Sequence, residues 1–484
     1  MPSLLIVTEK FDVGGLETYI RGQVRAMTRA GWRVMLACGG QPRPELLPDD
    51  IADACRGLPL GGAANAGHLL HATRTLRQFI QAHGITHVHA HPFTSLFPAL
   101  LAAKLEGVPY IATLHGPSSL DAGYGPFNDF LLGGMVLGHA DRVIAVSEEV
   151  GQLAAPYVGP DVLAVQPNAV DTEVFEAGPA PVEASRWLLV SRLDAFKIVG
   201  IRQFAKEARA AGLPGIDVAG DGPAQGHLQE QLAQDGLGEF VRFLGVRTDI
   251  AELMRASAGV AGMGRVLLEG LASGRPCCLV GYDGVKGMVD ATLFDAAASA
   301  NFSGRNLPNI GSGQLREQLA GLAGHGDPAP SRKVVAAYAE ATVWQGFADS
   351  ITPLPARPVP VLTAMYDVLQ TEAVQADTVP YLHSDDFWYQ VGRVLHGARH
   401  YAPGLADAYA FHARRAQQLA ARHERAAAAQ KDTSAANELA QLRQELTGLR
   451  EQVDALRQIL HAHLAAQEDK SAWWSRWMRK APRA

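Results

Sequence analysis

The sequence predicts an α/β protein with two Rossmann-like domains that face a cleft, followed by a helical and coiled-coil C-terminal extension. Its 484 residues exceed what one hydrophobic core usually supports. Short apolar runs alternate with helical patterns in two successive series, which is typical of parallel sheets built from βαβ units. Beyond residue 383 the composition becomes that of long helices, and leucines recur three and four positions apart.

Residues 1–175 carry the first series and are expected to form an N-terminal Rossmann-like domain. A helix is predicted at Glu17–Ala30, where Gly31 ends it. Met1 leads almost directly into an apolar run without a basic segment, so we interpret that run as a strand and not as a signal peptide. The predicted strands are Leu4–Thr8, Arg33–Ala37, His87–His89, Tyr110–Leu114, Arg142–Val146 and Val162–Val165.

Residues 183–340 carry the second series and are expected to form a C-terminal Rossmann-like domain, after a linker near residues 176–184. The carboxyl ends of both sets of parallel strands should meet at the cleft, where ligands of such sheets bind. A helix is predicted at Val334–Ile351, and the part at 341–352 is expected to return to the N-terminal domain. The predicted strands are Trp187–Val190, Ile216–Ala219, Val241–Leu244, Val260–Gly262 and Cys277–Val280.

The rest of the chain differs in composition from both domains. Residues 353–382 contain a proline-rich stretch and are predicted to be a linker. Residues 383–466 form a predicted helical region with a coiled coil near 439–460, for which the alternative is a surface helix packed back on the domains. The tail at 470–484 combines three tryptophans with basic residues and has no acidic residue. We therefore expect a homo-oligomer formed through the coiled coil and a tail that rests on an anionic membrane surface.

Charge and composition exclude several classes of partner. The formal net charge of −6 gives no overall attraction to nucleic acid, so no nucleic-acid partner is expected. The four cysteines show no metal-ligand spacing and no acidic pair is spaced to hold a cation, so no metal site is predicted. No apolar stretch of the sequence is long enough to span a bilayer. These features favour a cytoplasmic protein that lies peripherally on the inner face of the cytoplasmic membrane.

Glycine and histidine follow strands of the first series. Gly14 and Gly15 precede the first helix, and glycine there lets backbone amides approach an anion at a helix amino terminus. Paired glycines are equally common in an ordinary strand-to-helix turn. His115 follows the strand at Tyr110–Leu114 and can donate to a ligand hydroxyl, although its position alone favours a loop histidine without a role.

Charged residues follow strands of the second series. Arg192 and Lys197 come directly after Trp187–Val190 and can neutralise a diphosphate, while the alternative is a solvated surface pair. A second motif runs from Gly264 through Arg265 to Glu269 and places a carboxylate in the first turns of a helix. A carboxylate there can accept hydrogen bonds from both hydroxyls of a ribose.

These motifs, in this order, resemble the retaining glycosyltransferases of family 4, which have the GT-B fold, over residues 1–352. The resemblance implies an N-terminal acceptor-side domain and a C-terminal domain that binds a nucleotide-diphosphate sugar. It implies His115 as a catalytic residue beside the donor sugar, with Arg192 and Lys197 as catalytic residues at the diphosphate. The donor-binding residues that it implies are Gly14, Gly15, Arg192, Lys197, Gly264, Arg265 and Glu269.

One position departs from the family pattern. Glu269 matches the second glutamate of the family's Glu-x7-Glu motif, but Ala261 stands where the first glutamate is expected. Backbone amides of residues 262–265 and the charge of Arg265 are expected to contact the sugar instead. The implied reaction transfers a hexosyl group, with retention at the anomeric carbon, to a glycan, lipid-linked or other surface-polymer acceptor, with no cofactor and no metal.

Two other functions fit parts of the sequence. A degenerate glycosyltransferase fold that acts as a binding or assembly module is favoured by Ala261, but the presence of Arg192, Lys197 and Glu269 argues against it. A two-domain sugar epimerase of the same fold is disfavoured, because the long C-terminal extension suits transfer to a large acceptor.

Overall fold

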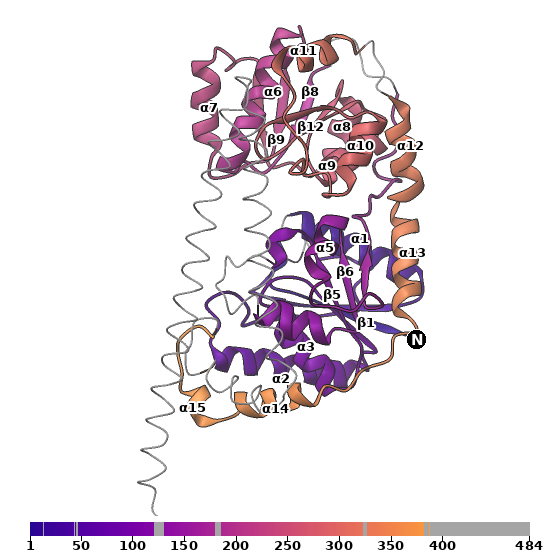
Figure 1. Ribbon diagram of the computed structural model, residues 1–484, viewed down its shortest axis with the longest axis vertical. Helices are drawn as coiled ribbons and strands as arrows, with labels where there is room; N and C mark the ends of the chain where they lie inside the picture. The colour runs from indigo at the N-terminus through magenta and orange to yellow at the C-terminus, as the bar shows by residue number, and fades with distance from the viewer. Residues whose placement is uncertain are drawn as a thin grey trace, which may run out of the picture.

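The computed structural model shows two α/β units that lie end to end along the long axis of the molecule (Figure 1). It describes residue 387 and residues 1–381, except for residues 13, 43, 45–46, 121–129, 180–184 and 323–326. The helical region predicted at 383–466, apart from Phe387, therefore lies outside the described residues, together with the coiled coil near 439–460 and the tail at 470–484.

The N-terminal unit is built on a parallel sheet of seven strands in the order β3-β2-β1-β4-β5-β6-β7. The strands are β1 (Ser3–Thr8), β2 (Arg33–Gly39), β3 (Asp53–Leu58), β4 (His87–Ala90), β5 (Tyr110–Leu114), β6 (Arg142–Ala145) and β7 (Leu163–Val165). Because β1 pairs with both β2 and β4, the strand order reverses beside β1. The carboxyl ends of β1 and β4 therefore stand at the switch point where open α/β sheets bind ligands.

Helices cover both faces of this sheet. They are α1 (Gly15–Arg29), α2 (Ala66–His83), α3 (Leu96–Leu105), α5 (Glu148–Ala154), a 3-10 turn at Pro117–Leu120 and a π-helical segment at Phe130–Leu137. Alternate residues of β1 enter two separate cores, since successive side chains of a strand point to opposite faces. Leu4 and Ile6 pack with α1, whereas Leu5 and Val7 pack with α2 and α3.

The C-terminal unit repeats this plan with a six-stranded sheet in the order β10-β9-β8-β11-β12-β13. Its strands are β8 (Trp187–Val190), β9 (Ile216–Ala219), β10 (Val241–Gly245), β11 (Val260–Gly262), β12 (Cys277–Val280) and β13 (Val285–Met288), and only the last pairing is antiparallel. Its helices are α6 (Ile198–Ala210), α7 (Gln225–Gln234), α8 (Ile250–Ala256), α9 (Arg265–Ala272), α10 (Ala291–Ala298), α11 (Ser312–Ala320) and α12 (Pro328–Ala337). The predicted fold class of two Rossmann-like domains is thus confirmed for the described residues.

The chain passes between the two units twice, and the two crossings are hydrogen-bonded to each other. The amide of Val170 donates to the carbonyl of Tyr338 at 2.7 Å, and the amide of Glu340 donates to the carbonyl of Val170 at 2.9 Å. Arg25 of α1 pairs with Asp171 at 2.8 Å and with Glu340 at 3.0 Å. This hinge therefore consists of two adjacent backbone segments fastened to α1.

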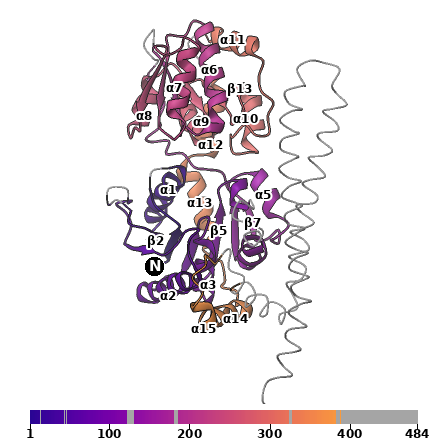
Figure 2. The same ribbon diagram turned by 90° about the vertical axis from the view of Figure 1, so that its left-hand side faces the viewer.

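The helix predicted at Val334–Ile351 is in fact two helices, α12 and α13 (Glu340–Ile351). The break lies at Tyr338 and Ala339, where the second crossing occurs. Helix α12 packs on α9 of the C-terminal unit, and α13 packs on α1 of the N-terminal unit, so the two helices lie one after the other along the side of the molecule (Figures 1 and 2).

The segment predicted as a linker at 353–382 is not a bare linker. It forms α14 (Pro360–Leu369) and α15 (Glu372–Gln375), and both pack against α2. Leu362, Met365 and Leu369 are buried in the same core as β1 and α3 because they recur at helical spacing. The N-terminal unit therefore includes a second C-terminal segment besides α13.

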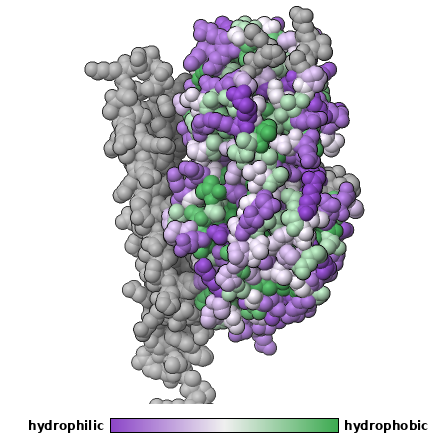
Figure 3. All heavy atoms as spheres, turned by 90° about the vertical axis from the view of Figure 1, so that its right-hand side faces the viewer, coloured by the Kyte–Doolittle hydropathy of each residue, from purple (hydrophilic) through white to green (hydrophobic). Residues whose placement is uncertain are grey.

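The surface over α12 and α13 mixes polar and apolar side chains without one dominant apolar patch (Figure 3). Within the part of the chain that the structure describes, no helix is both long enough and apolar enough to cross a lipid bilayer.

Candidate active site

The turn between β1 and α1 is shaped by Gly14 and Glu17. Gly14 is extended, and a Cβ atom there would lie 2.6 Å from Oε2 of Glu17, so a larger residue would displace this carboxylate. Glu17 is buried, and its Oε1 accepts a hydrogen bond from the amide of Asp12 at 3.1 Å. A Cβ at Gly15 would meet no atom within 4 Å, and α1 has no side-chain cap. The first amides of α1 are thus available to an anionic ligand.

Two histidines stand side by side at the ends of β4 and β5. Nδ1 of His91 lies 2.9 Å from Nε2 of His115, and the ring of Tyr19 packs edge-on against both imidazoles. His91 is fully buried, whereas His115 is partly exposed. Burial, together with the positive charge of Arg265, lowers the pKa of His115 to about 3. The imidazole at this position is therefore neutral at physiological pH.

Arg192 and Lys197 surround one carboxylate on the loop after β8. Nε of Arg192 lies 3.1 Å from Asp194, and Nζ of Lys197 lies 3.6 Å from it while donating to the Arg192 carbonyl at 3.1 Å. The Lys197 side chain is 14% exposed and that of Arg192 is 73% exposed. Burial lowers the pKa of Lys197, although Asp194 opposes the shift. Because two cations share one anion, the loop keeps one net positive charge at the amino terminus of α6.

The turn after β9 packs directly against this cationic loop. A Cβ at Gly220 would collide with the carbonyl oxygen of Ser191, and one at Gly222 would collide with that of Leu193. Gly220 also has a φ of 122°, which a side chain disfavours. The amide of Leu193 donates to the Asp221 carbonyl at 2.8 Å. Glycine at both positions therefore lets the two loops form one continuous surface at the sheet edge.

The third motif begins at the amino terminus of α9. Gly264 has a φ of 63°, and its amide donates to the carbonyl of Phe302 at 2.8 Å. Its role is therefore conformational, and this amide is not free for a sugar as the sequence suggested. Nη2 of Arg265 lies 3.2 Å from Oε1 of Glu269, and Nη1 donates to the Ala169 carbonyl in the hinge at 2.8 Å.

Glu269 and Ala261 are both buried, with different consequences. Burial raises the pKa of Glu269, and the adjacent Arg265 acts against this shift. The arginine thereby favours the ionised carboxylate that could accept hydrogen bonds. Ala261 is fully buried in the middle of β11 and packs in the core beneath the sheet. This position contributes no polar group to the cleft.

The predicted charged residues of the C-terminal unit form two groups after β8 and β11. Arg265 and Glu269 are in direct contact, and Arg265 is close enough to His115 for its charge to affect that ring. Arg192 and Lys197 contact each other through their own loop, and no hydrogen bond or ion pair among the described residues links them to Arg265. Since β8 and β11 are adjacent parallel strands, both loops nevertheless emerge at the same sheet edge.

Three further contacts join the two units directly. The side chain of Asn168 donates to Asn301 at 2.9 Å, and the amide of Glu149 donates to the carbonyl of Ser299 at 2.9 Å. Arg305 forms an ion pair with Glu149 at 2.7 Å. Sequence reasoning did not identify these contacts, because each one depends on how the two sheets are oriented.

Sequence reasoning also missed His91 and Tyr19. The signal for His91 was present, because it continues the alternation of His87 and His89 by one step beyond the end of β4. Tyr19 had no comparable signal within its helix. Among the described residues, no group of three or more histidine, cysteine or acidic side chains could hold a metal ion.

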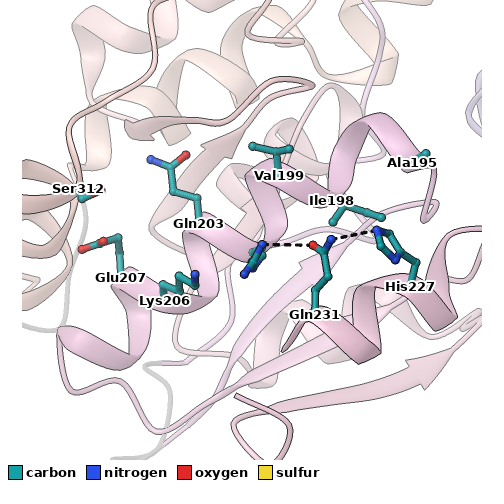
Figure 4. A pocket seen from close by; sticks show the side chains of 10 residues that line it. Ala195, Ile198, Val199, Gln203, Lys206, Glu207, His227, Gln231 and Ser312 are labelled. Atoms are coloured by element: carbon teal, nitrogen blue, oxygen red, sulfur yellow. Dashed lines mark hydrogen bonds between the residues drawn. The ribbon is translucent and has the colours of Figure 1, made fainter. Parts of the chain in front are cut away.

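A surface pocket of about 450 Å³ lies on the C-terminal unit between α6, α7 and the start of α11 (Figure 4). None of the predicted site residues lines it. Its lining combines apolar side chains of α6 with charged and polar ones, and Arg202 and Lys206 there are both paired with Asp235. The pocket is therefore separate from the candidate active site.

The chain is similar to known glycosyltransferases in both sequence and fold. The family model of Glycosyltransferase Family 4 matches residues 13–174. The putative glycosyltransferase EpsF of Bacillus subtilis (strain 168) is 30% identical over 247 residues, which make up 46% of this chain and 63% of that relative.

Solved structures share the arrangement of both units. Anabaena Alr3699/HepE in complex with UDP gives a TM-score of 0.53 at 18% identity and covers 73% of this chain and 100% of that one. A glycosyltransferase from Rickettsia africae ESF-5 gives 0.51 at 16% identity, covering 73% of this chain and 99% of that one. At these identities the likeness shows the fold alone.

Proposed function

We propose that this chain is a family 4 glycosyltransferase with the GT-B fold. In this proposal it transfers a hexosyl group from a nucleotide-diphosphate sugar with retention at the anomeric carbon. The acceptor that we propose is a glycan, a lipid-linked sugar or another surface polymer. The observation that carries this proposal is the sheet edge after β8 and β11, where a net positive loop adjoins the Arg265–Glu269 pair.

The cationic loop suits the donor diphosphate. A diphosphate gains negative charge as the sugar leaves, and fixed positive groups stabilise that charge most where water is partly excluded. Lys197 meets this condition because its side chain is only 14% exposed. The amino terminus of α6, which begins directly after Lys197 and has no side-chain cap, adds the favourable end of a helix dipole. These groups supply the charge that a cation would otherwise provide.

The pair on α9 suits the nucleoside and the sugar. Glu269 can accept hydrogen bonds from the two ribose hydroxyls in its ionised form, which the adjacent Arg265 favours against the effect of burial. His115, on the opposite unit, is neutral and faces the charge of Arg265. We propose that this histidine contacts the transferred sugar and that the charge of Arg265 takes part in place of the missing glutamate.

A degenerate protein that binds a nucleotide sugar without transferring it is the second candidate. The burial of Ala261 in β11 favours this candidate, because β11 (Val260–Gly262) carries no carboxylate that could contact the sugar. Both candidate proteins would bind a nucleotide sugar, but only the enzyme would release the nucleoside diphosphate.

The decisive experiment incubates the purified full chain with a panel of UDP-, GDP- and dTDP-sugars and measures release of the nucleoside diphosphate. The enzyme is expected to release it with one donor, and the anomeric coupling constant of the product should show retention. His115→Ala should lower turnover far more than affinity for the nucleoside diphosphate. Binding without release across the whole panel would support the degenerate protein.

We also propose that the C-terminal extension joins copies of the chain and contacts a membrane. Its sequence supports a homo-oligomer formed through the coiled coil near 439–460 and contact of the tail at 470–484 with an anionic membrane. A cytoplasmic location, peripheral on the inner face of the cytoplasmic membrane, would bring the cleft to a lipid-linked acceptor.

A further inference from the structure

The contact between His91 and His115 leaves each ring with one unused nitrogen. The shared hydrogen bond joins Nδ1 of His91 to Nε2 of His115. Nε2 of His91 is buried and has no hydrogen-bond partner among the described residues. Nδ1 of His115 likewise has no partner among them, but it belongs to a partly exposed ring. Of these two unused nitrogens, the one on His115 is therefore the one that a ligand in the cleft can reach.

Each ring carries a single proton. Burial lowers the pKa of His91 well below its usual range and that of His115 to about 3. Two neutral imidazoles that share one hydrogen bond have two possible arrangements, because either ring can be the donor. The arrangement decides whether the nitrogen of His115 at the cleft is a donor or an acceptor.

The buried nitrogen of His91 distinguishes the two arrangements. If His115 donated, the proton of His91 would sit on its buried Nε2 without an acceptor. If His91 donates through Nδ1, its Nε2 is a bare lone pair. Orphaned buried N–H groups are rarer in proteins than under-satisfied acceptors, so the second arrangement is favoured. The proton of His115 then resides on Nδ1.

We infer that His91 is a positioning residue, which holds His115 in the tautomer with a proton on Nδ1 and so provides the cleft with a hydrogen-bond donor. This inference rests on the proposed function, in which His115 lies beside the donor sugar. An N–H group there can donate to a sugar hydroxyl oxygen and cannot remove a proton from it. His115 therefore orients the sugar and does not act as a general base.

The surroundings of His91 are rigid enough for this role. Its amide donates to the carbonyl of Val7 at 2.9 Å, and its carbonyl accepts a hydrogen bond from the hydroxyl of Ser95. On the ring side, Tyr19 contacts both imidazoles and is itself packed against Trp344 of α13. His91 is completely excluded from solvent. A ring fixed in this way also fixes the ring that it bonds.

Two substitutions separate the hydrogen bond from the packing. In His91→Asn the side-chain amide can still donate to Nε2 of His115 from about the place of the ring Nδ1. In His91→Phe the ring volume is kept, but the donor is lost. Nε2 of His115 would then face an aromatic ring, which favours a proton on Nε2 through an N–H···π contact. Melting temperatures of both variants verify that they fold.

The direct test is the tautomer of His115 in the full-length chain labelled with ¹⁵N-histidine. Two-bond ¹H–¹⁵N correlation spectra distinguish a protonated ring nitrogen from a bare one, and His115→Gln identifies which of the 17 histidines gives the signal. We expect a proton on Nδ1 in the wild type and in His91→Asn, and on Nε2 in His91→Phe. A proton on Nε2 in the wild type, or the same tautomer in His91→Phe as in the wild type, would overturn the inference.

Kinetics test the consequence for catalysis. His91→Phe should lower kcat about tenfold and leave KM for the nucleotide sugar within about twofold, since the N–H group of His115 matters most in the transition state of sugar transfer. His91→Asn should recover most of the lost kcat. Equal losses in both variants would also contradict the inference. If the wild type turned over no donor at all, the proposed function would fail, while the tautomer spectra would still decide this inference.

Discussion

At the scale of single residues, Arg192 and Lys197 share Asp194 but differ in exposure. A hydrogen bond from a charged group is worth more when solvent does not compete for it. The side chain of Lys197 is 14% exposed, and that of Arg192 is 73% exposed. The two residues that the sequence treated as an equivalent pair should therefore contribute unequally to binding.

Lys197→Ala should weaken binding of UDP or GDP by about 1.5 to 3 kcal/mol, and Arg192→Ala by about 1 kcal/mol or less. Isothermal titration calorimetry measures both losses. Lys206→Ala is the matched control, because Lys206 lies on α6, which begins directly after Lys197, but it pairs with Asp235 and lines the separate surface pocket. Affinity unchanged from wild type in both site variants would remove the diphosphate assignment.

Glu269 offers a second residue-scale prediction. Glu269→Ala should weaken binding of a nucleoside diphosphate and spare binding of inorganic pyrophosphate, because the ribose alone loses its acceptor. Glu269→Gln keeps the volume and one acceptor oxygen, so its loss should be smaller. A competition assay with both ligands distinguishes the cases. If pyrophosphate lost as much affinity as the nucleotide, Glu269 would act through the phosphates and not through the ribose.

At the scale of elements, strand β4 presents His87 and His89 to helix α13. Nε2 of His87 donates to the carbonyl of Ile351 at 3.0 Å, at the end of the helix, and the ring of His89 packs against Phe347. His89 is also bonded to Gln23 and Thr113, at 2.8 and 2.7 Å. Nδ1 of His89 accepts a hydrogen bond from the side-chain amide of Gln23, so a second proton on this ring would break that contact.

This arrangement predicts that the folded protein loses stability below about pH 6.5, the usual pKa of histidine in an unfolded chain. Burial lowers the pKa of His87, of His91 and, to about 3, of His89. The unfolded chain therefore binds protons first as the pH falls, and each such group removes up to about 1.4 kcal/mol of stability per pH unit. Above pH 6.5 the contribution is fully present.

Urea unfolding at pH 7.5 and pH 5.5 measures this loss. His89→Gln should make the difference between the two pH values smaller than in the wild type, whereas His227→Gln, at an exposed position on α7, should not change it. Comparison of variants also cancels the contribution of Glu269 and Glu340, whose raised pKa values act in the opposite direction. If His89→Gln left the pH dependence of stability unchanged, the loss of stability at low pH would not come from protonation of His89.

The elements also show how far the sequence could be interpreted. Strands with continuous apolar runs, such as β1 and β8, were predicted almost to their ends. β3 was not, because Asp53–Leu58 is an edge strand without an apolar run, in which Leu58 alone is buried. β13 was hidden by Lys286, a lysine inside a strand whose ammonium group is buried among Asp283, Asn309 and the Leu307 carbonyl.

The site was predictable to a similar degree. Motif positions such as Arg192 and Glu269 follow from their place after strands, because the carboxyl ends of parallel strands share one edge. The contact of Arg265 with the Ala169 carbonyl could not be predicted, since it joins segments whose distance depends on the angle between the two sheets. The occupied amide of Gly264 depends on a loop nearly forty residues later in the chain and was hidden for the same reason.

At the scale of the whole molecule, the C-terminal extension leads to a prediction about membranes. Each basic residue near an anionic surface contributes about 1 kcal/mol, and a coiled coil would add the tails of several chains together. Removing residues 470–484 should release the protein from phosphatidylserine-containing vesicles without changing its oligomeric state. Co-sedimentation and light scattering measure the two properties. Full vesicle binding by the truncated chain would contradict the anchor. A chain truncated after residue 387 keeps α14 and α15 in the N-terminal core and should lose both properties.

The two hydrogen-bonded crossings at Val170 and Tyr338 return the chain to the N-terminal unit, from which the C-terminal extension begins. This path affects which unit moves when the extension is bound to a surface. After the second crossing, the described chain stays on the N-terminal unit through α13, α14 and α15. The C-terminal extension is therefore joined in sequence to that unit. If the extension binds the protein to a membrane surface, the N-terminal unit is held still on that surface. The C-terminal unit, which we propose to bind the nucleotide sugar, would then be the one that moves. It would rotate about the hinge at Val170 and Tyr338 to bring the sugar to an acceptor held by the N-terminal unit.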